Sequence, residues 1–470
     1  MLKFTKLEKD VIKIKDYIDR SEISFCDLSI GMKYMWRDEY VVDYAIVNDT
    51  LIMKEDGPDY KNVFYYPCGQ DVLGALSLIE EYCRAKNIPL VFGCVDNQKA
   101  GFLASRYKDV QIENDRDWSD YIYDAERFKT YSGKKLSGQR NHVNKFKRLY
   151  PEYSFKKIQP EDLPLIKQFL IEYEQSKVLS AGAKDEYDKI EDYLDNLFNL
   201  GQVGGYILVN GKVVAISIGE VVGNTLIVHI EKGLLDYEGV YPTMASEFAK
   251  AFADGAVKYI NREEDCGEIG LRISKLQYQP VEIKEKNMVY VKTLFDRIFA
   301  PVLIKTERLT ICDIAYSDAK RYAQLYLDDE LNKWWGYDYR EDLGKNKPTP
   351  EYFFEFQNKL KENKEEYALA VKKDGVMVGE LVLHNFDYNG GIEMGFRFFS
   401  DCQGKGYATE SAMALRDYCF DILGANTVKS RCFKQNNPSK RLIERIGLKQ
   451  TTENQTHYFF ALEKLLQKNV

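Results

Sequence analysis

The stretch DCQGKGYATE, residues Asp401–Glu410, contains two glycines one residue apart, a lysine between them and the start of a helical pattern. It follows a strand-like segment, so Gln403–Ala408 is predicted to form a turn between a strand and a helix. Gly404 and Gly406 lack Cβ atoms, which lets successive backbone N–H groups converge on one point. The unpaired N–H groups and positive dipole end of the helix reinforce this effect. The stretch therefore predicts a phosphate or pyrophosphate site, although paired glycines can also serve turn geometry alone.

The segments around this stretch predict a mixed α/β domain over residues 301–470. Their order is a strand KTERLTIC, a helix over residues 317–331, a hairpin with Asp374-Gly375 at its turn and a strand GIEMGFRFFS. After the glycine turn come a helix to Leu423, a strand TVKSRCF and a last helix from Pro438. The alternating runs and the Asp-Gly turn are typical of antiparallel strands.

The first 300 residues repeat this order less clearly. A helix is predicted over residues 69–87, followed by the strand IPLVFGCV and a helix from Asn97. Further on, Asn210-Gly211 predicts a hairpin turn, and a Gly223-Asn224 turn, a helix over Thr243–Ala253 and a strand near residues 258–261 follow. A period of about 150 residues is too long for a solenoid and favours repeated domains. We place the boundaries at residues 1–130, 131–300 and 301–470.

Composition restricts the class of protein. The net charge is -7, which argues against a nucleic-acid coat protein but allows a local basic patch. No apolar run approaches about 18 residues, so no membrane span is predicted, and the N-terminus lacks the apolar core of a signal peptide. The nine cysteines form no C-x-x-C pair and the four histidines are far apart. We therefore expect reduced thiols, a cytoplasmic location and no metal site.

Three motifs in residues 301–470 resemble GCN5-related N-acetyltransferases (the GNAT superfamily). Gln403-x-x-Gly406-x-Ala408 matches their Q/R-x-x-G-x-G/A signature. The T-E-R-L sequence at Thr306–Leu309 and N-x-x-S at Asn436–Ser439, before a helix ending in Gly447, resemble the ribosomal-protein N-terminal acetyltransferase type. With the repeat pattern, the resemblance implies an α/β (mixed α+β) fold of three consecutive GNAT-like domains, each with a mixed twisted central sheet flanked by helices.

This resemblance implies acetyl-CoA as the ligand of the glycine turn. Its pyrophosphate would lie on the backbone amides of residues 404–409, and its pantetheine would pair like an extra strand beside Phe396 and Phe398. Asn436 would lie near the thioester, and it can also be a helix N-cap. The implied cofactor-binding residues are Phe396, Phe398, Gln403, Gly404, Lys405, Gly406, Tyr407, Ala408, Thr409, Asn436 and Ser439.

Acetyl transfer to an amine needs a group that accepts the amine proton and a proton for the leaving thiolate. Glu393 in GIEMGF and Glu380 in VGELVL are the candidate bases, although either can be an ordinary strand residue. Many members of the superfamily have a general-acid tyrosine in the last helix, where this chain has Ile443. Either Tyr458 is then the general acid, or the reaction proceeds without one.

The amine acceptor, a small molecule or a peptide, is expected near the aromatic loop DELNKWWGYDYREDLGKN. Trp334, Trp335 and Tyr337 are its candidate substrate-binding residues, and its acids can favour a cationic amine or simply face solvent. The sequence does not predict the acceptor itself or the oligomeric state.

Two charged regions are notable in the first 300 residues. From Arg127 to Arg148 there are eight basic residues and no acid, and a helix from about Ser137 would place Arg140 and Lys147 on one stripe. This is either a solvated basic face or a wall that binds a phosphate, a lipid head group or RNA. The second region, residues 259–280, places mixed charges at the end of a strand, where ligands bind in open sheets. Its candidate substrate-binding residues are Arg262, Asp265, Arg272 and Lys275.

These stretches resemble uncharacterised bacterial proteins related to the C-terminal domain of phosphatidylglycerol lysyltransferase. The matching segments are Arg140–Phe146, His229–Gly233, N-R-E-E-D-x-G from Asn261 and G-L-R-x-x-K-x-x-x-x-P from Gly270. The resemblance implies two tandem GNAT-like folds, and better-known relatives transfer an aminoacyl group from aminoacyl-tRNA. The helix near Thr243 is not preceded by Q-x-x-G-x-G/A, so no second CoA site is expected. The lipid-modifying relatives carry a membrane-spanning portion that this sequence lacks, which argues against a bilayer substrate and integral membrane association.

We therefore expect an acyltransferase whose C-terminal domain acetylates a primary amine of a small molecule or a protein N-terminus. The N-terminal region would be a degenerate or aminoacyl-transferase-like domain. The alternative is an aminoacyl-tRNA-dependent transferase or a non-catalytic module that binds tRNA or another anionic partner.

Overall fold

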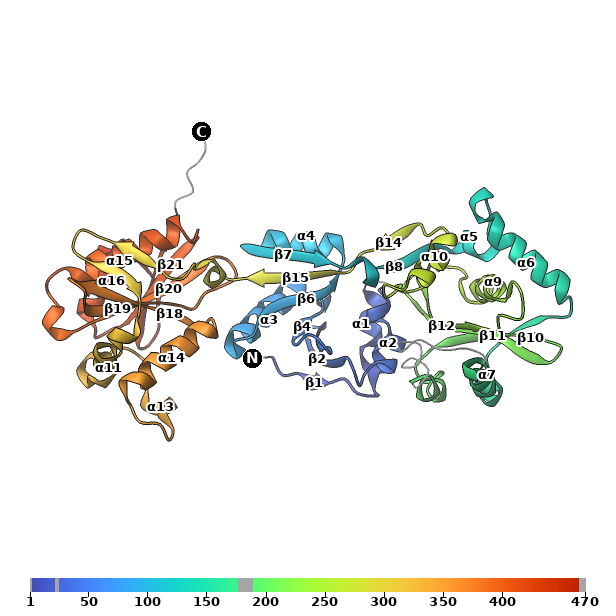
Figure 1. The fold of residues 1–470 in the computed structure, drawn as a ribbon, viewed down its shortest axis with the longest axis horizontal. Helices are drawn as coiled ribbons and strands as arrows, with labels where there is room; N and C mark the ends of the chain where they lie inside the picture. The colour runs from blue at the N-terminus through green and yellow to red at the C-terminus, as the bar shows by residue number, and fades with distance from the viewer. Residues whose placement is uncertain (1, 22–24, 176–188, 465–470) are drawn as a thin grey trace. The chain divides into compact units, whose positions relative to one another are not determined.

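The computed structural model describes residues 2–21, 25–175 and 189–464, with three β-sheets among them (Figure 1). Their contacts divide the chain into two compact units. The larger unit, called unit 1, comprises the described residues of Met1–Cys83, Leu90–Phe102 and Ile112–Tyr290. Unit 2 comprises those of Arg84–Pro89, Leu103–Gln111 and Val291–Val470.

Sheet A is built mainly from the first 114 residues, in the order β1-β2-β3-β4-β6-β15-β7, with β5 pairing β3. Its strands are β1 (Thr5–Lys6), β2 (Val41–Val47), β3 (Thr50–Asp56), β4 (Val63–Phe64), β5 (Cys68–Gly69), β6 (Leu90–Val95), β7 (Asp109–Asn114) and β15 (Asn287–Lys292). The helices of this region are α1 (Lys15–Arg20), α2 (Ile30–Met35), α3 (Val72–Lys86) and α4 (Asn97–Arg106). Strands β2 and β3 are antiparallel and β4 and β6 parallel, so the sheet is mixed.

Sheet B has the order β14-β8-β13-β12-β11-β10-β9. Its strands are β8 (Asp120–Asp124), β9 (Ser154–Lys157), β10 (Val203–Val209), β11 (Lys212–Val222), β12 (Thr225–Gly233), β13 (Tyr259–Asn261) and β14 (Glu282–Lys284). The helices with it are α5 (Ala125–Thr130), α6 (Ser137–Leu149), α7 (Leu163–Gln175), α9 (Val240–Phe252) and α10 (Ile269–Gln277). The pair β12 and β13 is parallel and the pair β11 and β12 antiparallel.

Sheet C has the order β16-β17-β18-β19-β20-β21-β23-β22. Its strands are β16 (Leu303–Lys305), β17 (Thr310–Asp313), β18 (Glu366–Lys373), β19 (Val376–His384), β20 (Gly391–Phe398), β21 (Thr427–Phe433), β22 (Lys449–Glu453) and β23 (His457–Glu463). The helices are α11 (Ala319–Leu327), α12 (Asp329–Asn332), α13 (Arg340–Leu343), α14 (Pro350–Glu362), α15 (Tyr407–Asp421) and α16 (Asn437–Arg445). Here β20 and β21 are parallel.

All three sheets are mixed and flanked by helices, which confirms the predicted fold class. The predicted boundary at residue 130 does not describe every strand, because β8 belongs to sheet B and β15 belongs to sheet A. One hydrophobic core also joins side chains from the first 70 residues with side chains of residues 158–234. All three domain ranges stay predictions, although among the described residues no sheet crosses residue 300, because β15 ends at Lys292 and sheet C begins at Leu303.

Local signals were accurate where the backbone needed positive φ. The hairpin between β10 and β11 turns at Asn210 (φ 50°) and Gly211 (φ 79°), and that between β18 and β19 at Asp374 (φ 50°) and Gly375 (φ 80°). Such turns match the twist of the strands they join.

Two segments differ from the sequence prediction. Thr306–Leu309 is not strand but the turn between β16 and β17, closed by a 2.9 Å hydrogen bond from the Thr306 amide to the Leu309 carbonyl. Residues 270–277, predicted to lie at the end of a strand, form most of helix α10. In the part of the chain that the structure describes, no helix is long and apolar enough to cross a membrane.

Candidate active site

The glycine turn leads into the N-terminus of α15, as the sequence predicted. Gly404 has φ 73° and Gly406, the N-cap residue of α15, has φ 82°, both in the left-handed region that favours glycine. A Cβ added to Gly404 would meet no atom within 4 Å, and one on Gly406 would meet only Arg308 Nη2 at 3.2 Å. The amides at this helix end therefore face open space, which suits an anion.

The T-E-R-L turn holds the first turn of α15 in place through Glu410. Thr306 Oγ1 donates to Glu410 Oε1 at 2.5 Å, and the Arg308 amide donates to the same oxygen at 3.0 Å. The Arg308 guanidinium donates to Glu410 Oε2 at 2.7 Å and to the Lys405 carbonyl at 3.1 Å. Although burial opposes ionisation, these hydrogen bonds lower the pKa of Glu410. The T-E-R-L turn and the glycine turn, about 100 residues apart in the sequence, are thus joined by hydrogen bonds.

The other predicted residues of the turn differ in exposure. Gln403 is exposed and donates to the Phe398 carbonyl at 3.0 Å, and Lys405 is exposed and donates to the Asp401 carbonyl at 2.7 Å. Tyr407 is buried under the Arg308 guanidinium, which lies 5.1 Å from its ring centroid. Ala408 and Thr409 are half-buried. The side chain of Lys405 therefore packs on the turn instead of pointing across it.

Strands β20 and β21 diverge beside this helix. Among the described residues they pair only from Gly391–Glu393 to Thr427–Lys429, although β20 continues to Phe398 and β21 to Phe433. At the start of the divergence, Ser430 Oγ donates to the Met394 carbonyl at 2.9 Å. The edge of β20 that carries Phe396 and Phe398 is therefore available to an extended ligand, which would add to the sheet as a strand does.

The N-cap prediction for Asn436 is confirmed, because its side chain accepts a 3.2 Å hydrogen bond from the Ser439 amide at the start of α16. Ile443 of that helix is fully buried. Tyr458, on β23, is partly buried, and Lys440 Nζ lies 4.4 Å from its ring centroid. Because Tyr458 is opposite Cys432 in β21, strand alternation puts it on the Ser430 face of the sheet, away from the Glu393 face.

Glu380 lies in a buried ion pair. It is fully buried, and Arg397, directly opposite on β20, donates to Glu380 Oε1 through Nε at 2.8 Å. Arg397 also donates to the Leu325 carbonyl at 3.2 Å and to Asn332 Oδ1. Arg397 thus links the Glu380 carboxylate to the loop after α11. The role of Glu380 as a base stays a prediction.

Glu393 lies at the point where β20 and β21 begin to diverge, and its side chain is 14% exposed. Asn385 Nδ2 donates to Glu393 Oε2 at 2.8 Å, and Arg431 Nε lies 3.2 Å from Glu393 Oε1. His384 Nε2 is 4.0 Å from the same oxygen. The sequence did not single out His384, because its register opposite Glu393 depends on the hairpin between β19 and β20.

Two of the three predicted aromatic residues lie against the same face. The ring centroids of Trp334 and Phe433 on β21 are 5.7 Å apart, and the Trp335 ring lies 4.5 Å from the Arg397 guanidinium. Tyr337 instead stacks on Phe356 of α14 at 5.9 Å. Trp334 and Trp335 therefore lie on the face of sheet C that carries Glu393, whereas Tyr337 packs on α14.

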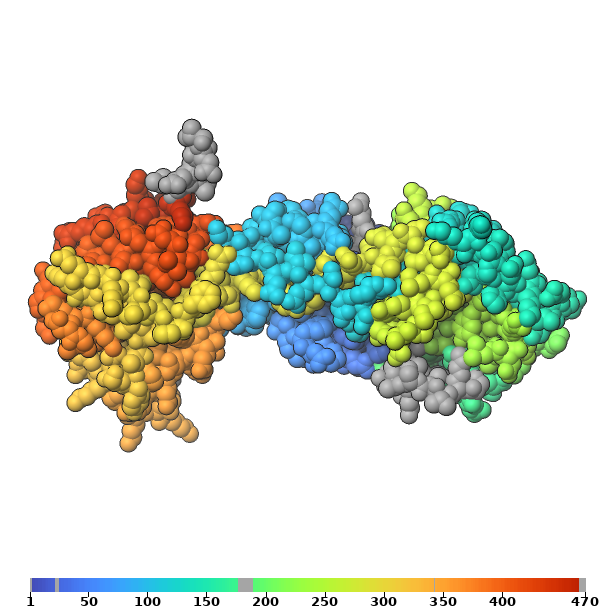
Figure 2. Space-filling model, turned by 45° about the horizontal axis from the view of Figure 1, so that its top comes forward, coloured from blue at the N-terminus to red at the C-terminus, as the bar shows by residue number. Residues whose placement is uncertain are grey.

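The corresponding helix of sheet B is covered. Gly239, the N-cap residue of α9, has φ 86°, close to the value of Gly406. A Cβ on Gly239 would collide with the His142 carbonyl oxygen and approach Phe146 Cβ to 3.1 Å, both in α6. Helix α6 lies against α9 within unit 1, and its outer side forms part of the teal surface (Figure 1, Figure 2). The position that an anion would occupy at α9 is thus filled by protein.

Comparison with known proteins matches both halves of the chain. Residues 20–290 match the family model described as phosphatidylglycerol lysyltransferase, C-terminal, which is more than half of the chain. A conserved protein of unknown function from Bacteroides thetaiotaomicron VPI-5482, solved by crystallography, is 31% identical with a TM-score of 0.57. The match covers 62% of this chain and all of that one.

The chain belongs to the phosphatidylglycerol lysyltransferase C-terminal family. Residues 308–449 match the model described as acetyltransferase (GNAT) domain. The uncharacterized N-acetyltransferase YnaD of Bacillus subtilis (strain 168) is 29% identical over 27% of this chain and 78% of its own length. The uncharacterized N-acetyltransferase p20 of Bacillus licheniformis is 25% identical over 30% of this chain and 79% of its own. This member of the lysyltransferase family is therefore also a GNAT N-acetyltransferase, as its sequence motifs indicated.

In the lysyltransferase-like unit, the predicted basic residues of α6 bind other parts of the unit. Arg140 donates to the Tyr131 carbonyl and, at 3.1 Å, to the Gly133 carbonyl. Lys147 Nζ lies 3.7 Å from Glu247 of α9. Arg140 thus stabilises the turn before α6, and Lys147, which stays exposed, helps to hold α6 on α9.

Arg262, Asp265, Arg272 and Lys275 do lie together, but they bind one another and their neighbours. Arg262 pairs with Glu231 at 2.9 Å, and Lys275 donates to the Arg262 carbonyl at 2.5 Å. Arg272 donates to Asp265 at 2.7 Å. Burial opposes the charge on Asp265, yet hydrogen bonds from Arg272, Tyr121 and the Gly267 amide together outweigh it and hold the pKa of Asp265 well below its usual value. Burial lowers the pKa of Lys275. The sequence predicted the grouping but not that it is satisfied internally.

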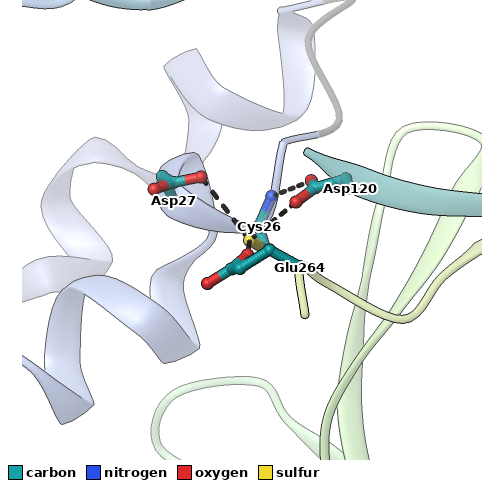
Figure 3. Close-up of side chains that lie close together, drawn as sticks. All are labelled: Cys26, Asp27, Asp120 and Glu264. Carbon is teal, nitrogen blue, oxygen red and sulfur yellow. Dashed lines mark hydrogen bonds between the residues drawn. The ribbon is translucent and has the colours of Figure 1, made fainter. Parts of the chain in front are cut away.

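A second charged cluster was missed, because four separate segments build it. The donor atoms of Cys26, Asp27, Asp120 and Glu264 all lie within 4.8 Å of one another (Figure 3). Lys286 Nζ lies 2.7 Å from Asp120 Oδ1 and 3.1 Å from Glu264 Oε2, and it also pairs with Asp27. These donors would suit a metal ion, but the Lys286 ammonium already supplies the positive charge among them. The acidic run from Glu263 to Asp265 was its one signal in the sequence.

His229 forms a third centre, between two carboxylates. Its Nε2 lies 3.0 Å from Glu220 Oε1 and its Nδ1 2.7 Å from Glu263 Oε1, and it is buried. Glu220 also accepts from the Gly31 amide at 2.6 Å, in the first turn of α2. Burial opposes the imidazolium, but the two carboxylates outweigh it and raise the pKa of His229 to about 9. A histidine that stays protonated at neutral pH serves as a structural cation rather than a base.

Proposed function

We propose that residues 301–470 transfer an acetyl group from acetyl-CoA to a primary amine of a small molecule or a protein N-terminus. The observation that carries this proposal is the juxtaposition of two features: β20 and β21 diverge after Glu393, and the open, glycine-capped N-terminus of α15 follows β20 directly. The free edge of β20 could bind an extended amide arm, and the N-terminus of α15 directly after it could bind a pyrophosphate, so the two together suit CoA.

The chain's own residues fit this ligand in three places. The amides of residues 404–409 would bind the pyrophosphate, since a Cβ at Gly404 would meet open space. The edge of β20 beside Phe396 and Phe398 would bind the pantetheine arm, and Asn436 lies at the start of α16 beyond β21. Bound acetyl-CoA supplies an activated acyl carbon. The chain then has to place the amine, exclude water and accept a proton.

The acceptor would enter on the face that carries Glu393, beside Trp334 and Trp335. Aromatic rings bury much apolar area at low entropic cost, and the Glu393 carboxylate attracts an ammonium group. Arg431, 3.2 Å from Glu393, partly offsets that attraction. We therefore propose that a primary amine on an apolar or aromatic carrier binds better here than a polycation.

The decisive experiment is calorimetric titration of the full-length chain with CoA, using Gly404→Asp and Gly404→Asn as a matched pair. Both residues tolerate positive φ, and they differ by one charge in the open position. We expect one CoA per chain, a loss of about 100-fold or more for Asp and a few-fold loss for Asn. Equal CoA affinities for the two variants would show that the pyrophosphate does not bind at the glycine turn.

Acetyl transfer itself is tested by mass spectrometry with acetyl-CoA and a panel of probes: phenethylamine, spermidine and a hexapeptide with a free N-terminus. We expect an added acetyl group on at least one primary amine, and phenethylamine to react faster than spermidine. A chain that binds CoA but acetylates no member of a broad amine panel would contradict the proposed reaction.

For the lysyltransferase-like unit we propose a second candidate function, binding of tRNA or another polyanion, with or without aminoacyl transfer. The supporting observation is that Lys134, Lys135, Lys147 and Arg148 are exposed on and just before α6. Charge reversal at Lys147 and Arg148 should weaken tRNA binding and reduce its salt dependence. Lys258→Glu, an exposed reversal before β13, is the matched control. If the double reversal and the control bind alike, α6 is not the RNA surface.

A further inference from the structure

Three titratable side chains form a row across sheet C. Glu366 on β18 lies opposite His384 on β19, which in turn lies opposite Glu393 on β20. Directly opposed residues of paired strands project from the same face. The row continues to Lys429 on β21, because Glu393 is paired with it just before the two strands diverge. His384 is thus one strand away from the divergence, on the face that the acceptor would approach.

The space around the His384 imidazole is shaped by a missing side chain. Gly395 follows Glu393 on the same face, and a Cβ built on it would lie 3.9 Å from His384 Nε2 and 3.4 Å from Trp335. His384 Nε2 and the Trp335 ring edge therefore border one position above Gly395, and Glu393 Oε1 lies 4.0 Å from His384 Nε2. The His384 side chain is 19% exposed, so the imidazole is largely shielded from water.

The charges around His384 favour its neutral form. Burial lowers the pKa of His384, Glu393 acts in the opposite direction, and Arg431 lowers it further. Burial raises the pKa of Glu366 to about 7, which weakens any support that its carboxylate would give to an imidazolium. His457 on β23 also has a lowered pKa, chiefly through burial. A neutral imidazole has a nitrogen lone pair free to accept a proton at neutral pH.

The carboxylates of this face are less suited to the same task. Glu380 is held by Arg397, and Glu393 accepts from Asn385 and lies against Arg431. Each of these carboxylates is therefore already engaged by donors of this chain. The position of Glu393 beside His384 instead suits it to orient the imidazole and to stabilise its protonated form.

We propose that His384 is the catalytic residue that accepts the proton of the acceptor amine, and that Glu393 is a positioning residue for its imidazole. This inference rests on the proposed function and deepens it, because it replaces a carboxylate base with a histidine. As the amine nitrogen forms its bond to the acetyl carbon, an imidazole nitrogen of His384 takes the proton that the nitrogen loses. The carbon–sulfur bond breaks, and the sulfur takes up one proton from water or from the imidazolium.

The first test measures the imidazole directly in the full-length chain. Labelling with ¹³Cε1-histidine gives four signals, one for each histidine, and His384→Gln identifies the signal that disappears. We expect His384 to titrate below 6.5 and Glu393→Gln to lower its pKa further, since a nearby negative charge is removed. A His384 that is protonated at pH 7, or whose pKa does not respond to Glu393→Gln, would overturn the proposal.

The second test is the pH profile of kcat/KM with whichever probe amine the chain acetylates. We expect His384→Gln to lower kcat by about 100-fold and to remove the fall in rate at acidic pH, with CoA affinity unchanged. His142→Gln, an exposed histidine of α6, serves as the control and should keep full activity. A folded His384→Gln chain that keeps more than half of its kcat would contradict His384 as the base.

The two tests separate this inference from the proposed function. If the wild-type chain neither binds CoA nor transfers acetyl, the proposed function is wrong. If the wild-type chain is active and His384→Gln keeps its kcat, only the role of His384 is wrong. If His384→Gln does not fold, the titration of the wild-type and Glu393→Gln chains still decides the outcome, with signals assigned from single replacements of the other three histidines.

Discussion

Helices α9 and α15 begin in the same way but meet different surroundings. Each follows a strand that is parallel to its neighbour, and each starts at a glycine with φ above 80°, Gly239 in unit 1 and Gly406 in unit 2. At α15 a Cβ on Gly406 would meet only the end of the Arg308 side chain, at 3.2 Å, and one on Gly404 would meet no atom. At α9 the backbone and Phe146 of α6 occupy the corresponding space.

The residues just before the two glycines explain the difference. Where α15 has Gly404 and Lys405, α9 has Tyr237 and Glu238. The Glu238 carboxylate pairs with Lys145 of α6 at 2.5 Å, and the Tyr237 ring packs on Tyr150 at 5.3 Å. The fold therefore supplies N–H donors at both helix starts, and the neighbouring segment decides whether a ligand can reach them.

The largest loss of stability is expected from Arg397→Met. It tests how far sheet C, like sheet B, depends on a buried charge pair between adjacent strands. Sheet C pairs Glu380 with Arg397, and sheet B pairs Glu220 with His229. Removing Arg397 leaves Glu380 buried without its partner, at a cost of about 3–5 kcal/mol. Calorimetric unfolding should show the loss in unit 2 alone. An unchanged melting temperature for unit 2 would contradict the pair's role.

The pH dependence of unit 1 is next in size. The pKa of His229 is raised to about 9, above its unfolded value near 6.5, so its contribution is complete below pH 6.5 and is lost as pH rises to 9. The change is about 3 kcal/mol, and Glu263, whose pKa burial raises to about 7, acts in the same direction over a lower pH range. Denaturant titrations from pH 6 to 9.5 measure it. His229→Gln should flatten the curve, and a wild-type unit that gains stability with pH would refute the assignment.

The covered and the open turn are compared by Gly239→Ala and Gly404→Ala, because Gly404, two residues before the N-cap Gly406, is the glycine whose added Cβ would meet no atom. Both substitutions place a Cβ at positive φ, which costs about 1–2 kcal/mol. At Gly239 the methyl group also collides with the backbone of α6, which adds about 1–3 kcal/mol of overpacking, whereas at Gly404 it meets no atom. Hydrogen exchange should show α6 and α9 opening more easily in the first variant. Equal losses in both would mean that α6 does not fill the position.

The smallest effect is expected from Lys405→Ala. The Lys405 ammonium donates to the Asp401 carbonyl and is exposed, so backbone amides rather than this side chain would carry the phosphate contact. CoA affinity should fall by less than about 5-fold at physiological salt, because exposed charges are screened. A loss of CoA affinity as large as that of Gly404→Asp would show that the Lys405 side chain, not the backbone amides of the glycine turn, is the main contact with the phosphate.

The sequence was most informative where structure is local. The turns at Asn210-Gly211 and Asp374-Gly375, the start of α15 and the Asn436 cap follow from backbone conformations that few residues adopt. It was least informative where partners come from distant segments. The register that sets His384 against Glu393 and the four charged side chains around Cys26 depend on packing that no short motif encodes.

The candidate site shows the same division. The glycine turn before α15 could be predicted from one decapeptide, because Gly404 and Gly406 adopt positive φ angles that few other residues tolerate. The different surroundings of Glu380 and Glu393 could not, because both are acids on central strands, and the burial of Glu380 against Arg397 depends on the pairing of β19 with β20.

The place of β15 in sheet A has a consequence for how the chain is made. This strand lies between β6 and β7 in the sheet but follows β7 by more than 170 residues in the chain. On a ribosome, β6 and β7 would emerge and wait on the order of tens of seconds for the strand that separates them. Residues 1–130 released alone would expose two unpaired strand edges, so they are expected to aggregate or to need a chaperone, whereas a fragment that reaches residue 292 can close the sheet.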